Sequence, residues 1–234
     1  MADNEAILLR DDENEEIKPI IVVTKKQNLF YRIVKRTVDI IGAIVGLILL
    51  IPITLIVGLL RIIKKENDGP LFYEQLRIGK NGKQFRMYKY RSMCMNADET
   101  LKEYLEKNEE AKKEYKKYKK LKCDPRITKV GKVLRATSLD EFPQLINVLK
   151  GEMSLVGPRP YLPREKKEMG EYYHTIIKVK PGITGPWQIR GRSNISFEDR
   201  VKMDLNYVQT CSIKKDFIIL LKTLTKVVDR DGAI

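Results

Sequence analysis

The longest uncharged stretch of this chain, Ile40 to Leu60, limits the fold most, because it is apolar enough to enter a membrane. At ~1.5 Å per residue, a straight helix of this length would just cross a ~30 Å hydrocarbon layer. Pro52 lies just past the middle, lacks a backbone N–H and crowds the carbonyl of Ile48, which bends or breaks a helix. The sequence therefore predicts a membrane helix that is bent at Pro52.

The charges at the two ends of this stretch favour a re-entrant segment, which dips into the membrane and returns. Lys35 and Arg36 precede it, and Arg61, Lys64 and Lys65 follow it. Cationic flanks tend to remain in the cytoplasm, so both ends are expected on the same side. A straight single-pass helix remains the alternative, because transmembrane helices tolerate proline.

The formal net charge of +14 predicts an anionic partner: lipid headgroups, nucleotide phosphates or nucleic acid. The membrane segment favours lipids and phosphorylated substrates, and no nucleic acid is expected, because the chain has no zinc-finger spacing or base-reading motif. Cys94, Cys123 and Cys211 are odd in number and far apart, which disfavours disulfides and a zinc site. The single histidine, His174, disfavours a histidine-rich metal site.

Three segments are expected along the chain. Residues 1–28 are acidic, lack the basic start of a signal peptide and predict a disordered cytoplasmic tail. Residues 29–66 predict an interfacial helix that leads into the re-entrant segment. Residues 67–234 are long enough for one cytoplasmic domain with its own core, with a charged helical insert at about 98–122.

The patterning of this domain indicates a helix-rich α+β fold. Leu71–Met93 predicts a small β-hairpin, because its turn contains Asn81-Gly82, a pair that accepts positive φ. Asp98–Lys122 predicts an amphipathic helix or a helical pair, either solvated or used to bind a partner such as a second copy of the chain. Phe217–Val228 has an apolar face and several lysines, which suits packing against the core or lying on an anionic membrane.

The densest candidate for chemistry is the segment from Thr137 to Leu145. Ser138 and Glu141 have capping-box spacing, so helix capping alone would explain them. Pro143 is tolerated only in a first turn, which moves the predicted helix start to about residues 140–142 and weakens the capping box. Asp140 and Glu141 would then lie at a helix N-terminus, where anions, phosphates and metals are favoured. This motif alone leaves catalysis and capping open.

Six motif blocks occur in order along the chain. They are Lys35-Arg36-x-x-Asp39, Gly69-Pro70 with Gln75-x-Arg77, Lys89-Tyr90-Arg91-Ser92-Met93, Ser138 to Leu145, Gly157-Pro158-Arg159-Pro160, and Pro181 to Arg192. Together these blocks resemble the bacterial sugar transferase family, the monotopic phosphoglycosyl transferases. The long insert is similar to that of undecaprenyl-phosphate galactose or glucose phosphotransferases. Family members often place serine before the membrane proline, whereas this chain has Ile51-Pro52, so a bend must rely on Thr54, the protein or the interface.

The resemblance implies an enzyme at the cytoplasmic face of the inner membrane. It would transfer a hexose-1-phosphate from a UDP-sugar, UDP-galactose or UDP-glucose, to polyprenyl (undecaprenyl) phosphate, release UMP and initiate cell-surface glycan synthesis. Asp140 would be the nucleophile and form an aspartyl-phosphosugar intermediate. Glu141 would hold Mg²⁺, with Asp140 as a second candidate ligand.

Arg159 is the expected phosphate clamp, because prolines on both sides stiffen it and a guanidinium suits bidentate phosphate contacts. Other residues are candidates for binding the substrate, and each of them could instead have a surface or structural role. Those candidates are Lys89, Arg91, Arg135 and Arg192 for phosphates, and Gln188 for the nucleotide or sugar.

Two other functional classes remain open from the sequence. A non-catalytic membrane-anchored adaptor would use Asp98–Lys122 to bind another protein. An enzyme of another class, such as a nucleotidyltransferase, is the second alternative. The sequence has no Walker-type phosphate loop to support it.

Overall fold

The computed structural model describes residues 7–8, 19–20, 27–66, 68–118, 121–190 and 195–228. Two short strands near the start, β1 (Ile7–Leu8) and β2 (Pro19–Ile20), pair antiparallel. Most of the predicted tail, residues 1–28, lies outside the described residues, and so does Arg192.

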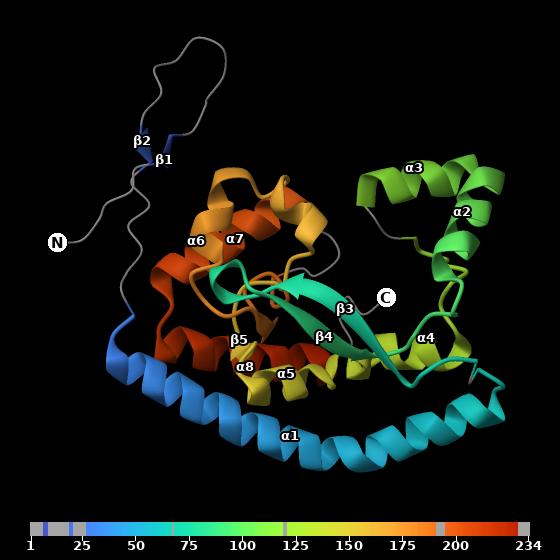
Figure 1. Cartoon of the computed structure of the whole chain (residues 1–234), viewed down its shortest axis with the longest axis horizontal. Helices are drawn as coiled ribbons and strands as arrows, with labels where there is room; N and C mark the ends of the chain where they lie inside the picture. The colour runs from blue at the N-terminus through green and yellow to red at the C-terminus, as the bar shows by residue number, and fades with distance from the viewer. Residues whose placement is uncertain are drawn as a thin grey trace, which may run out of the picture.

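The apolar stretch lies within one long helix, α1 (Leu29–Ile63), which has 35 residues. Asn28 begins it by accepting a hydrogen bond from the Tyr31 N–H at 2.8 Å. The helix is unbroken through Pro52, and it curves with its concave side toward the rest of the molecule (Figure 1). Next to the proline, the Thr54 hydroxyl donates to the Leu50 carbonyl at 2.7 Å. The sequence predicted a bend or a break, and the structure has a continuous curved helix.

Both ends of α1 are attached to the same folded domain, which lies on its concave side (Figure 1). Arg36 donates to the carbonyls of Val148 and Leu149 at 2.6 and 2.9 Å, in the last turn of α5 (Gln144–Lys150). At the other end, Arg61 donates to three backbone carbonyls in residues 66–70, at 2.9 to 3.2 Å. Between these anchors, the helix buries Ala43, Leu50 and Val57 against the domain.

A β-hairpin forms where the sequence predicted one. Its strands, β3 (Phe72–Ile78) and β4 (Gln84–Tyr90), pair antiparallel. The connecting turn contains the short helix η1 (Lys80–Gly82), in which Asn81 and Gly82 have φ of 57° and 77°. This confirms the positive φ expected of the Asn-Gly pair. Inward-facing side chains of β4 form a core with α1 and α5: Ala43, Phe85, Met87, Leu145 and Val148.

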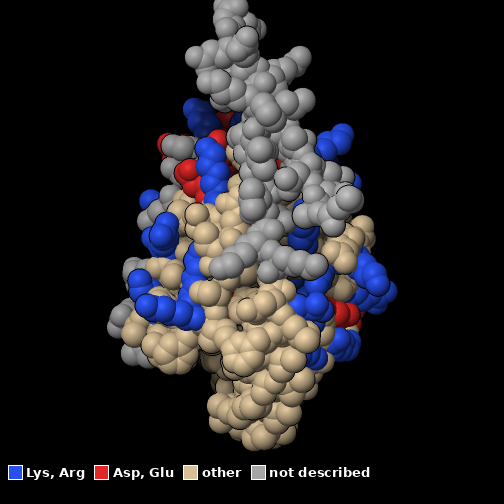
Figure 2. All heavy atoms as spheres, turned by 90° about the vertical axis from the view of Figure 1, so that its left-hand side faces the viewer, with Lys and Arg blue, Asp and Glu red and all other residues tan. Residues whose placement is uncertain are grey.

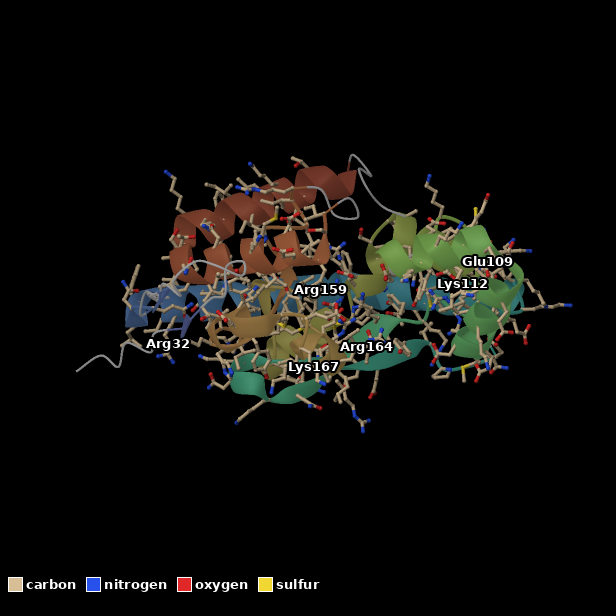
Figure 3. All side chains as sticks on the ribbon, turned by 90° about the horizontal axis from the view of Figure 1, so that it is seen from above. Arg32, Glu109, Lys112, Arg159, Arg164 and Lys167 are labelled. Atoms are coloured by element: carbon tan, nitrogen blue, oxygen red, sulfur yellow. The ribbon has the colours of Figure 1, made fainter. Side chains whose placement is uncertain are left out.

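The predicted insert is a pair of helices, α2 (Ala97–Lys107) and α3 (Glu109–Tyr118). Figure 3 shows Glu109 and Lys112 of α3 at the end of the molecule opposite Arg32 of α1. Beyond the insert come α4 (Lys129–Ala136), the one-turn helix η2 (Leu139–Glu141) and α5.

The remaining elements combine short helices with a second small sheet, which confirms the α+β class. Strands β5 (Ser154–Val156) and β6 (Gly182–Thr184) pair in parallel. The intervening and following helices are η3 (Pro163–Lys166), η4 (Gly170–Tyr172), α6 (Tyr173–Ile176), α7 (Phe197–Thr210) and α8 (Ile213–Val228).

Large apolar side chains are exposed along the outward side of α1 and on α8. Within the described residues, α1 is the one helix long and apolar enough to cross a membrane. Phe217 and Leu224 of α8 are 60 % and 65 % exposed, so this face of α8 does not pack against the core. Figure 2 shows the underside without charged side chains and Lys and Arg side chains gathered just above it. Such a surface indicates membrane association.

A buried carboxylate, Asp216, joins α1 to α7 and α8. It accepts hydrogen bonds from Tyr31 Oη at 2.8 Å, Lys35 Nζ at 2.7 Å and Tyr207 Oη at 2.6 Å. We expect Asp216→Leu to lower the free energy of unfolding by about 3 kcal/mol, because it leaves the Lys35 charge without its partner. Denaturation in detergent measures this loss.

The matched control for this prediction is Glu74→Gln, because Glu74 pairs with Arg86 on the surface. Exposed ion pairs contribute less than about 1 kcal/mol, so this variant should unfold nearly as the wild type does. Equal losses in the two variants would contradict the role assigned to Asp216.

Candidate active site

The segment with Asp140 and Glu141 is a sharp turn between α4 and α5. Ser138 has a left-handed backbone with φ of 57°, and η2 then carries the two carboxylates. The Ser138 side chain makes no capping hydrogen bond, so the capping box does not form. Helix α5 begins at Gln144 after Pro143, later than the start predicted at residues 140–142. The two acids therefore precede a helix of 7 residues. The charges of Lys89, Arg159 and Arg77 act on Glu141.

Glu141 is ion-paired with Lys89 of β4. Lys89 Nζ lies 2.8 Å from Glu141 Oε1, and no hydrogen bond to Oε2 is found within the described part of the chain. Burial acts to raise the pKa of Glu141, but Lys89, Arg159 and Arg77 outweigh it and hold the pKa below its ordinary value. Glu141 is therefore a carboxylate at neutral pH.

Asp140 lies in a different electrostatic environment from its neighbour. Burial, together with the charge of Glu141, raises the pKa of Asp140 to about 6, although Lys89 and Arg135 oppose the shift. Adjacent acids with pKa values shifted in opposite directions are typical of functional sites.

Arg159 reaches this site from the turn after β5, and buried groups hold its backbone. Its N–H donates to Asp204 Oδ2 at 2.9 Å, and Tyr161 Oη donates to the same oxygen at 2.8 Å. Its guanidinium carbon lies 5.7 Å from the centre of the Trp187 ring, and Nη2 lies 3.5 Å from Glu165 Oε1. The pKa of Glu141 is lowered by the Arg159 charge, which places both in one electrostatic cluster.

Arg77 of β3 belongs to the same cluster, although it was not among the site residues predicted from the sequence. It is 8 % exposed, and Nη1 donates to the Pro160 carbonyl at 2.8 Å, directly after Arg159. Burial and the charge of Arg159 lower the pKa of Arg77 to about 10, and its own charge also acts on Glu141. A signal was present, since a basic residue stands between Leu76 and Ile78 in a predicted strand.

Of the other predicted site residues, Arg135 acts on the acid pair, whereas Arg91 and Gln188 contact backbone carbonyls. Arg135 of α4 donates through Nε to Ser92 Oγ at 3.0 Å, and its charge acts on Asp140. Arg91 Nε donates to the Pro70 carbonyl at 2.9 Å, so its contact is with the segment before β3. Gln188 Nε2 donates to the Ile183 carbonyl at 3.2 Å.

Polar atoms without partners gather around the turn that carries Arg159. Within the described residues, several buried side-chain atoms there make no hydrogen bond. Because buried polar groups normally have partners, these atoms indicate a site for a polar ligand. They are Arg77 Nε, Arg159 Nε, Trp187 Nε1, Gln188 Oε1 and Asp204 Oδ1.

The acids at this site suit a substrate-bound Mg²⁺ better than a metal enclosed by protein ligands. Among the described residues, no group of three or more His, Cys, Asp or Glu side chains could hold a metal ion. Mg²⁺ is commonly held by one or two carboxylates together with substrate phosphates and water. Glu141, with Asp140 beside it, provides a donor set of that kind.

The family model for bacterial sugar transferases matches residues 30–230, and the chain belongs to this family. It is 46 % identical over 203 residues to the undecaprenyl-phosphate galactose phosphotransferase of Salmonella typhimurium, covering 86 % of this chain and 42 % of the relative. It is 43 % identical over 193 residues to the exopolysaccharide production protein ExoY of Sinorhizobium fredii, covering 82 % and 84 %. An uncharacterized sugar transferase of Haemophilus influenzae is 46 % identical over 202 residues, covering 86 % and 42 %. The chain thus spans about two fifths of the length of two of these relatives.

Proposed function

We propose that this protein transfers a sugar-1-phosphate from a UDP-sugar to a polyprenyl phosphate and releases UMP. The observation that carries this proposal is the acid pair Asp140 and Glu141 within the charges of Lys89, Arg77 and Arg159. Its family membership and the name of the Salmonella relative support the same transfer. Galactose is the favoured sugar, although a relative from Aeromonas hydrophila, 35 % identical, is named for N-acetylgalactosamine.

The reaction proceeds in two displacements at one phosphorus. An Asp140 carboxylate oxygen attacks the phosphorus next to the sugar, the bond to the UMP oxygen breaks, and UMP leaves with the bonding electrons. A phosphate oxygen of the lipid then attacks the same phosphorus. The bond to Asp140 breaks, which restores its carboxylate and yields a lipid diphosphate sugar.

The surrounding cations make these encounters between anions feasible. Lys89, Arg77 and Arg159 offset the charge of two phosphate groups and two carboxylates, and they require no reorganisation during the reaction. Mg²⁺, when bound through Glu141 and phosphate oxygens, would supply further neutralisation of the leaving UMP. Arg135 favours the ionised form of Asp140, which is the nucleophilic form.

For α1 we propose a re-entrant placement at the cytoplasmic face of the inner membrane. A helix that spans the bilayer would separate its ends by ~30 Å of hydrocarbon. Arg36 instead donates to the Val148 carbonyl of α5. Glu66, just after the helix, accepts from the backbone N–H groups of Lys129 and Val130 in α4, which supports both ends on one side. In this position the lipid phosphate and the cytosolic UDP-sugar reach one site without crossing the membrane.

Cysteine labelling tests this placement. We expect cysteines introduced at Thr37 and Lys64 to react with a membrane-impermeant maleimide only from the cytoplasmic side. The background carries serine at Cys94, Cys123 and Cys211, all of which have free thiols. Labelling of positions 37 and 64 from opposite sides would show that the helix spans the membrane.

The proposed nucleophile also predicts a pH dependence. Its pKa is raised to about 6, so Asp140 loses its proton, and gains reactivity, as the pH rises through that value. We expect kcat to rise between pH 5 and pH 7 and then to level off. An Asp140 that titrates near its ordinary pKa would give a flat profile over this range, contrary to this expectation.

The experiment that tests the proposed function is a screen of UDP-sugars with undecaprenyl phosphate and Mg²⁺, in which UMP is quantified. We expect multiple-turnover UMP release that requires both substrates and is largest with UDP-galactose or UDP-glucose. Without the lipid, at most one UMP per protein molecule should be released. Release of sugar-1-phosphate, with UMP transferred to the acceptor, would indicate a nucleotidyltransferase. No release from any UDP-sugar, by protein that remains folded, would favour a membrane-anchored adaptor.

A further inference from the structure

A cavity of about 480 Å³ lies at the N-terminal end of α1, away from Asp140 and Glu141. Its walls come from α1, from the hairpin turn and from residues 179–180. Five basic residues line it, and Asp39 is the one acid among the lining residues that the structure describes. The basic residues are Arg32, Lys35, Arg36, Lys80 and Lys180.

Two of these cations have structural partners, and Asp39 is engaged elsewhere. Lys35 pairs with Asp216 at 2.7 Å, and Arg36 donates to the last turn of α5. Asp39 Oδ1 accepts from Ser154 Oγ at 2.9 Å and from the Leu155 N–H at 2.8 Å. Asp39 supplies one carboxylate against five cations, so it offsets only part of the positive charge in the cavity.

Three cations remain: Arg32, Lys80 and Lys180, whose side chains make no hydrogen bond or ion pair within the described ranges. Lys180 also approaches Arg36. A Cβ built on Gly151 would lie 3.3 Å from Lys180 Nζ and 3.7 Å from Arg36 Nη2. Partial burial and the charge of Arg36 lower the pKa of Lys180. Cations held this close, with little acidic compensation, favour an anion between them.

The cavity also has apolar walls on the side of the membrane surface. Leu29, Ile33 and Ile40 of α1 contribute to its lining, and Leu29 and Ile33 are 68 % and 57 % exposed. These residues continue the apolar face of α1. A ligand that fits both the cluster of cations and the apolar wall has a phosphate joined to hydrocarbon chains.

The cavity is separate from the candidate active site. None of Asp140, Glu141, Lys89 and Arg159 lines it. In Figure 3, Arg32 lies toward one end of the molecule and Arg159 near its centre. An anion in the cavity would therefore not occupy the position of the reacting phosphates.

We propose that this cavity binds the headgroup phosphate of an anionic phospholipid, which seats the N-terminal end of α1 in the membrane. Basic side chains close to a membrane favour the binding of anionic lipid. Inorganic phosphate shares the anionic group but lacks the chains that the apolar wall would contact. The proposal does not depend on sugar-phosphate transfer, because the ligand is neither donor nor acceptor.

The test measures lipid binding to the full chain in detergent without UDP-sugar, by native mass spectrometry. The probes are phosphatidylglycerol and phosphatidylcholine with identical acyl chains. We expect phosphatidylglycerol to bind about tenfold more tightly than phosphatidylcholine. The variant Lys80→Gln/Lys180→Gln should bind phosphatidylglycerol about tenfold more weakly than the wild type does. The matched control, Lys64→Gln/Lys65→Gln, removes the same charge at the other end of α1 and should stay within about twofold.

Three outcomes would overturn the proposal: equal loss in both double variants, equal binding of the two lipids, or displacement of phosphatidylglycerol by millimolar inorganic phosphate. Lys80→Arg/Lys180→Arg checks folding, because it keeps the charge and should keep the binding. Failure of this binding would leave the UMP assay unaffected, so the two proposals are tested separately.

Discussion

Asp140→Asn is expected to abolish turnover, with kcat at least about a thousandfold below that of the wild type. The change keeps the size of the side chain but replaces the nucleophilic carboxylate with an amide, which cannot form the aspartyl phosphosugar. The neighbouring acid cannot substitute, because Glu141 Oε1 is ion-paired with Lys89 at 2.8 Å. UMP release from UDP-galactose with undecaprenyl phosphate measures this loss.

The control for this variant is Asp98→Asn, the same chemical change at an exposed position in the first turn of α2. It should leave turnover within about twofold, because surface substitutions away from a site have small effects. Wild-type turnover by Asp140→Asn would mean that another group attacks the phosphorus or that the lipid attacks it directly.

Arg159→Lys is expected to lower kcat/KM by about a hundredfold, which is large for a substitution that keeps the charge. A guanidinium can make two parallel hydrogen bonds to a phosphate, whereas an ammonium acts as a point charge. Lysine would also lose the stacking of the guanidinium on the Trp187 ring, 5.7 Å from its centre. Steady-state UMP release against UDP-sugar concentration measures the effect.

Arg164→Lys is the matched control, since Arg164 is an exposed arginine in the segment that follows Arg159 (Figure 3). It should retain wild-type kinetics. If Arg159→Lys and Arg164→Lys behave alike, Arg159 does not form a bidentate contact with a reacting phosphate.

Features governed by local chemistry followed directly from the sequence. The hairpin was predictable because Asn81 and Gly82 accept the positive φ that its turn requires. The helical pair of the insert follows from apolar spacing between Asp98 and Lys122. Asp140 and Glu141 were identified through their motif, and their proximity to Lys89 and Arg159 was expected from the family resemblance.

Features that depend on long-range packing could not be predicted. The start of α5 at Gln144 follows a left-handed Ser138, a conformation uncommon outside glycine and asparagine. The strand pattern around Arg77 marks it as an unusual basic residue, but it does not identify its partner, the Pro160 carbonyl directly after Arg159. Helix α1 likewise runs unbroken through Pro52 and curves toward the domain that it packs against, which Pro52 did not reveal.

The most direct test of the central claim is intact-mass analysis of the protein after incubation with UDP-galactose and Mg²⁺ but no polyprenyl phosphate. A covalent intermediate on Asp140 predicts a mass increase of one hexose phosphate that maps to Asp140, is absent from Asp140→Asn and disappears when polyprenyl phosphate is added. Full UMP turnover with no adduct under rapid quenching, or an adduct on another residue, would contradict it.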